Sequence, residues 1–220
     1  MSLTMPLTIE NLGLVVEGKS IFAGLHLEVK TSQFISIMGE NGVGKTCLLE
    51  AIVGSRKISK GKILYWGKPK NEYDQVEFFS NIAWVSSSPE AYPLGARVFD
   101  LFDFLRRRYP TWNDSIAHNL CEKFKLYPTK KLSELSLGEH SKMRLIKAIC
   151  FEPKLLLLDE LTANLSPDSK SAVLSALMDI FSRTEMSVLY VCHSKEEANR
   201  FSDQIFELTE SGFKEKKVEI

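Results

Sequence analysis

The sequence predicts an α/β fold with a mixed sheet, a β-rich antiparallel N-terminal region and an inserted helical segment. Three observations support this prediction. Runs of strand length alternate with segments of helical spacing at both ends of the chain. An apolar run, a glycine-rich turn and a helical segment follow one another over residues 34–54, and a buried strand at Leu155–Leu158 ends in two adjacent acids. Carboxylates in that position lie at the sheet edge where α/β proteins bind their ligands.

The N-terminal third is rich in predicted strands. Leu7–Val16 and Ile21–Val29 read as strands joined by a turn at Glu17–Lys19, and Phe34–Met38 reads as a buried strand. A helix follows from Gly44, with apolar residues at helical spacing. It ends at Gly54, because a residue without Cβ readily takes the left-handed conformation that closes a helix.

The middle of the chain is predicted to be helical. Ile63–Trp66 and Ile82–Val85 look like further strands, after which Val98–Tyr109 and Ser115–Phe124 look like helices divided at Pro110. The sequence shows no repeat, low-complexity tract or linker. We therefore expect one domain over residues 1–220, with a helical lobe at about residues 90–150 inserted in the α/β core.

The last third returns to strands alternating with helices. A basic helix follows Leu135 and Ser136, and it leads to the buried strand at residues 155–158. A helix from about Pro167, a strand at Val188–Val191 and a short C-terminal strand region complete the pattern. Strand–helix alternation of this kind is typical of a parallel sheet.

Composition excludes several classes of function. The chain carries 28 Lys and Arg against 28 Asp and Glu, and a net charge of +0 provides no field to hold nucleic acid or an anionic membrane. The four cysteines lack CxxC spacing, which disfavours a zinc site or a disulfide framework and favours a reducing cytosol. No segment approaches the roughly 20 apolar residues that span a bilayer, and no leader is recognisable. We expect a cytoplasmic protein without direct membrane insertion, which serves a membrane only through a partner.

The glycine-rich turn fits the pattern GxxxxGK[ST], in which small residues let backbone N–H groups curl around phosphate oxygens at a helix N-terminus. It consists of Gly39, Glu40, Asn41, Gly42, Val43, Gly44, Lys45 and Thr46. Lys45 is placed to reach β and γ phosphates, and the Thr46 hydroxyl is placed to ligate Mg²⁺. The plainer alternative is a glycine turn that merely begins a helix. Its context between strand and helix favours a nucleoside triphosphate site.

The two acids after the buried strand complement that loop. Asp159 is placed to hold Mg²⁺, directly or through water, and Glu160 is placed to polarise the attacking water. The alternative is a solvated acidic turn, which a phosphate loop in the same chain makes less attractive. His193 follows a third apolar strand, and a lone His at a strand end is more often structural than catalytic.

Together with Leu135-Ser136-Leu137-Gly138-Glu139, these residues resemble the nucleotide-binding subunit of ABC transporters over essentially the whole chain. Kinases and GTPases lack this ordered set. The resemblance implies a P-loop NTPase core with Lys45, Glu160 and His193 as catalytic residues and Cys47 beside the α phosphate. It also implies a head-to-tail dimer, in which Ser136 and Gly138 cover ATP bound to the other subunit. A serine hydroxyl, a glycine N–H and a helix N-terminus suit a phosphate.

The implied function is ATP hydrolysis that powers a separate, polytopic membrane permease. ATP and Mg²⁺ are then the cofactors, and the subunit sits peripherally on the inner face of the cell membrane as a homodimer or a heterodimer. The segment RRRYPTWNDSIAHNLCEKFKL loosely resembles bacterial drug and antibiotic exporters, although Trp112 equally suits core packing. Two alternatives remain open: a catalytically weak regulatory half-site paired with another ABC subunit, and a soluble ABC ATPase without a transport role.

Several positions depart from the family pattern. Ser87 stands where a glutamine is usual, and a serine is too short to span from Mg²⁺ to the permease interface unless water completes the shell. Ser166 replaces the usual Asp, and Cys47 replaces Ser or Thr. No aromatic residue stands near Val16 to stack on adenine, so GTP is also a candidate. Glu139 is expected to add a negative charge near the phosphate of the other subunit.

Overall fold

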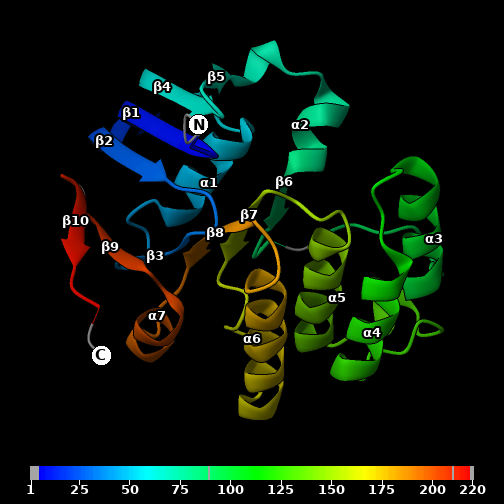
Figure 1. Ribbon diagram of the computed structural model, residues 1–220. Helices are drawn as coiled ribbons and strands as arrows, with labels where there is room; N and C mark the ends of the chain where they lie inside the picture. Colours follow the sequence, from blue (N-terminus) through cyan, green and yellow to red (C-terminus); the bar gives the residue numbers. More distant parts are fainter. Residues whose placement is uncertain (1–4, 89, 210, 219–220) are drawn as a thin grey trace.

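The computed structural model describes residues 5–88, 90–209 and 211–218, which form two sheets and seven α-helices (Figure 1). The strands are β1 (Leu7–Val16), β2 (Lys19–Val29), β3 (Phe34–Met38), β4 (Lys60–Tyr65), β5 (Lys68–Pro69), β6 (Ile82–Val85), β7 (Leu155–Asp159), β8 (Ser187–Val191), β9 (Gln204–Thr209) and β10 (Gly212–Lys216). The helices are α1 (Lys45–Val53), α2 (Gln75–Asn81), α3 (Val98–Arg108), α4 (Asp114–Phe124), α5 (Leu137–Ile149), α6 (Pro167–Phe181) and α7 (Lys195–Phe201). None of the helices in this part of the chain has the length and apolar character needed to cross a membrane.

The larger sheet has six strands in the order β10-β9-β3-β8-β7-β6. β6, β7, β8, β3 and β9 pair in parallel, and only β10 is antiparallel to its neighbour. The smaller sheet has the order β2-β1-β4-β5 and is antiparallel throughout. The predicted mixed sheet and antiparallel N-terminal region are therefore confirmed. In a parallel sheet the carboxyl ends of the strands share one edge, which makes that edge the place for a ligand.

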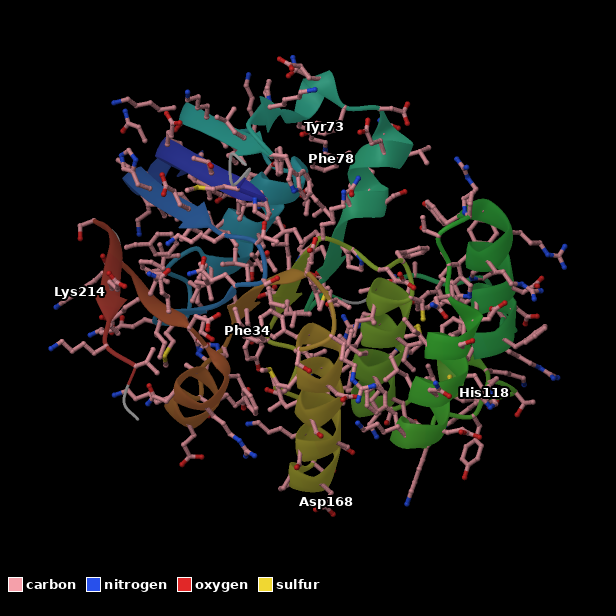
Figure 2. All side chains as sticks on the ribbon, viewed as in Figure 1. Phe34, Tyr73, Phe78, His118, Asp168 and Lys214 are labelled. Carbon is pink, nitrogen blue, oxygen red and sulfur yellow. The ribbon has the colours of Figure 1, made fainter. Side chains whose placement is uncertain are left out.

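Alternate side chains of the central strand β3 enter two different hydrophobic cores. Ile35 and Ile37 are fully buried on the face that packs against α1 and the antiparallel sheet. Phe34 is fully buried on the opposite face, where its ring lies edge-on to Phe181 at 5.5 Å and to Tyr190 at 6.1 Å. Figure 2 shows Phe34 near the centre of the molecule. Because the sheet is covered on both faces, its central strands β3, β7 and β8 are mostly apolar, and Ser36 and Ser187 within them are fully buried.

The helices α3, α4 and α5 gather on the side of the molecule away from the antiparallel sheet (Figure 1). Trp112 lies between α3 and α4 and is 8% exposed; its ring packs 5.4 Å from the rings of Phe102 and Phe151. Its indole Nε1 donates to Asp114 at 2.9 Å. The core-packing interpretation of Trp112 is thus confirmed.

Most predicted elements are present, and β1, β3 and β6 begin and end at the expected residues. The helix α1 ends as predicted, with Gly54 at φ 74°. Two seven-residue helices, α2 and α7, were not predicted. Both carry a cap that was available in the sequence: Asp74 accepts from the first turn of α2, and Ser194 accepts from Glu197 in α7. Their shortness hid the helical periodicity.

Candidate active site

Four neighbouring parallel strands end at the same edge of the six-stranded sheet, and the predicted site residues follow directly from them. The glycine-rich loop follows β3, Glu160 follows β7, His193 follows β8 and Ser87 follows β6. Asp159 is the last residue of β7 and pairs in register with Val191 of β8. The topology therefore brings groups from distant parts of the chain to one place.

The loop between β3 and α1 needs glycine at two close approaches. Gly39 and Gly44 have φ of 152° and 105°. A Cβ on Gly44 would lie 2.4 Å from Ile21 Cγ2, and one on Gly39 would lie 2.7 Å from the carbonyl oxygen of Leu208. Neither approach allows a side chain, so the backbone takes this tight path and exposes its N–H groups next to the N-terminus of α1.

Lys45 lies folded within the loop. Its Nζ donates to the carbonyl oxygens of Gly39 and Glu40, each at 2.9 Å, and the residue is only 5% exposed. Burial lowers the pKa of the Lys45 amino group, and the negative charges of Glu160 and Asp159 oppose this effect. A desolvated cation that donates to two neutral carbonyls would gain from an anionic partner such as a phosphate.

Asp159 is almost fully buried and fits a divalent cation. Its Oδ2 accepts from the Thr46 hydroxyl at 3.0 Å and from the Ser87 hydroxyl at 2.7 Å. Its Oδ1 is buried without a hydrogen-bond partner within the described residues. An orphaned carboxylate oxygen beside two hydroxyls is an all-oxygen donor set, which suits Mg²⁺.

Glu160 and His193 meet across adjacent strands, with His193 Nε2 at 2.7 Å from Glu160 Oε1. Glu160 adopts a left-handed conformation with φ 49°, and its backbone N–H donates to Val191 at 3.0 Å. A non-glycine residue held in this region is uncommon and often serves a site. Taken alone in the sequence, His193 is weak evidence for a catalytic residue; its contact with Glu160 links it to the acid pair.

Residues 135–139, which we call the signature segment, lie at the N-terminus of α5. Ser136 caps this helix through a capping box: its Oγ accepts from the Glu139 N–H at 3.2 Å, and its N–H donates to Glu139 Oε2 at 2.8 Å. Gly138 packs against the segment after the acid pair, since a Cβ there would lie 3.1 Å from the Asn164 carbonyl oxygen. Ser136 and Gly138 thus contact Glu139 and Asn164, and neither of these partners belongs to the glycine-rich loop.

Lys130 changes the interpretation of Glu139. Its Nζ lies 2.8 and 2.7 Å from the two carboxylate oxygens of Glu139. The hydrogen bond from Lys130 lowers the pKa of Glu139, so the carboxylate stays ionised and paired. The expected added negative charge is therefore compensated within the same chain. Lys130 lies nine residues before Glu139, too far for any local pattern to reveal it.

Three other departures have simple local settings. Ser166 caps α6, where its hydroxyl accepts from the Ser169 N–H at 3.4 Å. Cys47 is a half-buried free thiol in the first turn of α1. The Ser87 hydroxyl donates directly to Asp159 Oδ2 at 2.7 Å. Its expected failure to reach the permease interface stays a prediction.

A glycine-rich loop with a buried lysine, followed by an oxygen-donor carboxylate and a second acid at the same sheet edge, defines the class of P-loop nucleoside triphosphatases. Residues 22–163 match the family model described as ABC transporter. The chain belongs to the ABC transporter family, as an ATP-binding subunit with ATPase activity.

Relatives with known names agree with this assignment. An uncharacterized ABC transporter ATP-binding protein of Methanocaldococcus jannaschii is 30% identical over 93% of this chain and 82% of the relative. The probable iron export ATP-binding protein FetA of Escherichia coli is 27% identical over 92% of this chain and 90% of its own length. Spermidine/putrescine import ATP-binding proteins also match.

A solved structure confirms the fold. A dimeric ATP-binding cassette in a post-hydrolysis state, bound to ADP and Pi, superimposes with a TM-score of 0.82 at 20% identity. The match covers 97% of this chain and 99% of that one. The predicted P-loop core with its inserted helices is therefore the fold of this protein.

Proposed function

We propose that the sheet edge around Asp159 is the site of ATP hydrolysis, and that two such sites in a head-to-tail dimer drive a membrane permease. The observation that carries the proposal is the convergence of Lys45, Thr46, Asp159, Glu160 and His193 on the ends of three adjacent strands. The buried Asp159 Oδ1, which has no hydrogen-bond partner among the described residues, supports a cation as its partner.

The glycine-rich loop and Lys45 would bind the triphosphate. Backbone N–H groups of residues 39–46 donate to phosphate oxygens, with the adjacent Cys47 at the α phosphate, and Lys45 exchanges its two carbonyl contacts for the β and γ oxygens. Thr46 and Asp159 would hold Mg²⁺. When bound, the ion would supply the positive charge that neutralises the phosphate oxygens.

Glu160 would act as the general base. Its carboxylate accepts a proton from the water that attacks the γ phosphorus, while the bond from phosphorus to the bridging oxygen of ADP breaks. His193 holds the Glu160 carboxylate at 2.7 Å and so fixes the direction in which the base faces. A positioned base of this kind contributes about 10²- to 10⁴-fold to the rate.

Ser136 and Gly138 would complete the site of the other subunit. Both lie at the N-terminal end of α5, with Ser136 as its cap, whereas the phosphate loop precedes α1 beneath the antiparallel sheet (Figure 1). We propose that residues 1–220 act as one nucleotide-binding domain, with residues 90–150 as the lobe that meets the partner and the permease at the inner face of the membrane. Export is our proposed direction, supported by the exporter-like segment at residues 106–126 and by the similarity to FetA. Because import proteins also match, transport assays in proteoliposomes test the direction.

The test is MgATP binding measured by calorimetry, together with ATP turnover by the purified chain. Replacing Lys45 by Ala removes charge-assisted hydrogen bonds worth about 1.5 to 3 kcal/mol each, so affinity should fall roughly tenfold or more. Lys57→Ala, which removes an exposed lysine after α1, is the matched control and should bind as the wild type does. Unchanged affinity in Lys45→Ala would contradict the proposed site. Turnover that requires a second, unlike subunit would favour the regulatory half-site instead.

A further inference from the structure

The segment that follows β6 touches the candidate metal-binding carboxylate. Ser87 is the second residue after this strand, and its hydroxyl donates to Asp159 Oδ2 at 2.7 Å. The side chain of serine has one rotatable bond before its oxygen, so it cannot search for a partner as a longer side chain can. The position of the Ser87 hydroxyl is therefore set by the backbone that carries it.

Arg144 of α5 holds that backbone on both sides of Ser87. Its Nη1 donates to the carbonyl oxygen of Ser86 and, at 2.9 Å, to the carbonyl oxygen of Ser88. Its Nε donates to the His140 carbonyl oxygen of the same helix at 3.4 Å. Arg144 is only 7% exposed, so these bonds form away from bulk water, where charge-assisted hydrogen bonds are strong.

A second set of contacts joins α5 to the same segment farther along. Lys147 Nζ lies 2.5 Å from Glu90 Oε2, and the Tyr92 hydroxyl donates to the same oxygen at 2.7 Å. The Tyr92 ring stacks on His140, with centroids 6.2 Å apart and an interplanar angle of 10°. Burial raises the pKa of Glu90, but the hydrogen bond and charge of Lys147 outweigh this effect and lower it. The segment is thus attached to α5 at two places.

We propose that Arg144 is a positioning residue, which sets Ser87 against Asp159 so that the Ser87 hydroxyl shares in holding the divalent cation. The inference rests on the proposed function, because it needs the metal site at Asp159. It adds Arg144, a residue of α5, the helix that Ser136 caps. Arg144 thereby connects two parts of the same subunit. One is the metal site at Asp159, and the other is α5, whose N-terminal end is proposed to cover the ATP of the partner subunit.

The experiment measures the affinity of the protein for Mn²⁺ in the presence of saturating ADP. Electron paramagnetic resonance gives the concentration of unbound Mn²⁺. Ser87→Ala and Arg144→Met should each weaken Mn²⁺ binding roughly tenfold, the size expected for one lost charge-assisted contact. Because Arg144 acts through Ser87, the double variant should bind no more weakly than either single variant. Arg144→Lys should restore part of the affinity.

Lys142→Met is the matched control, since Lys142 is a basic residue of α5 whose Nζ donates to a backbone carbonyl of the helical lobe, that of Phe124, at 3.2 Å. It should bind Mn²⁺ as the wild type does. Additive losses in the double variant, or wild-type affinity in Arg144→Met, would overturn the proposal. If Arg144→Met fails to fold, Arg144→Lys decides: one amino group serves two carbonyls poorly, so a few-fold loss is expected and wild-type affinity would count against it.

A separate readout needs no metal. Hydrogen exchange of the peptide that contains Ser87 should be faster in Arg144→Met than in Lys142→Met, because the hydrogen bonds from Arg144 to the carbonyls of Ser86 and Ser88 are lost. Failure of the proposed function has a different signature. In that case the wild type itself binds no Mn²⁺ with ADP, whereas failure of this inference leaves wild-type binding intact and insensitive to Arg144.

Discussion

The proposed ATP site has two half-sites that are built in different ways. The first is the phosphate-loop half-site around Asp159, and the second is the signature segment at the N-terminus of α5. The first is assembled by a sheet: residues from the ends of β3, β7 and β8 meet because these strands are neighbours in parallel register. The second is assembled by one helix N-terminus, where Ser136 and Glu139 cap each other and Lys130 supplies the counter-charge. One half-site is fixed by the fold and the other by local contacts.

This difference bears on how each half-site tolerates change. Asp159 is 1% exposed and tied to two hydroxyls, so its surroundings leave little room for substitution. Glu139 lies on a partly exposed helix end, where an unusual residue is accommodated by a single lysine. We therefore expect large effects from substitutions in the first half-site and small, compensable effects in the second.

Glu160→Gln should give the largest effect. Removing the proposed base while keeping its shape should lower the ATP turnover number about 10²- to 10⁴-fold and leave MgATP affinity nearly unchanged. The slowly cleaved ATP should trap the head-to-tail dimer, which light scattering detects at saturating MgATP. Glu196→Gln, an exposed acid in α7, is the control and should turn over normally. A variant that stays monomeric would indicate that an unlike partner is needed.

The ends of the strands could be predicted from the sequence, and so could the residues that follow them. Leu155–Leu158 is apolar without interruption and Phe34–Met38 is apolar apart from Ser36, because both faces of the sheet are covered, and the GxxxxGK[ST] spacing marks the loop between β3 and α1. The pairing of Glu160 with His193 could not be predicted so directly, since it depends on β7 and β8 being neighbours.

Contacts made by long basic side chains could not be predicted at all. Lys130 and Arg144 occupy positions that look like ordinary charged residues of a helical region, and nothing in their spacing indicates Glu139 or the carbonyls around Ser87 as partners. Such contacts depend on how the helical lobe packs on the sheet. Sequence patterns report periodicity within an element, whereas these contacts join different segments: Lys130 lies nine residues before Glu139, and Arg144 lies 56 residues after Ser88.

Lys130→Met sharpens the comparison with a smaller effect. Losing Lys130 leaves the Glu139 carboxylate uncompensated beside the proposed phosphate of the other subunit, so ATP-dependent dimerisation of Glu160→Gln should weaken a few-fold. Adding Glu139→Gln should restore it. Lys131→Met is the matched control, because the exposed Lys131 pairs with Glu134 instead. If Lys130→Met and Lys131→Met dimerise alike, Glu139 has no electrostatic role at the interface.

Ser87→Gln tests the place where the two regions meet, and it should give the smallest effect. Sequence reasoning alone predicts that glutamine raises hydrolysis, because serine stops about two bonds short of the usual reach. The structure changes the sign of that prediction. The Ser87 hydroxyl already lies 2.7 Å from Asp159, and Arg144 fixes the backbone around it, so a longer side chain must displace one or the other.

We therefore expect Ser87→Gln to lower ATP turnover a few-fold, with MgATP affinity nearly unchanged, since the loop and Lys45 bind the phosphates independently. Steady-state hydrolysis measured beside calorimetry separates the two quantities. Ser88→Gln is the control, because Ser88 is exposed and its neighbour keeps the contact with Asp159. A rise in turnover on Ser87→Gln would mean that the segment after β6 is free to move outward. The contacts of Arg144 with the backbone around Ser87 would then be too weak to connect the metal site with α5.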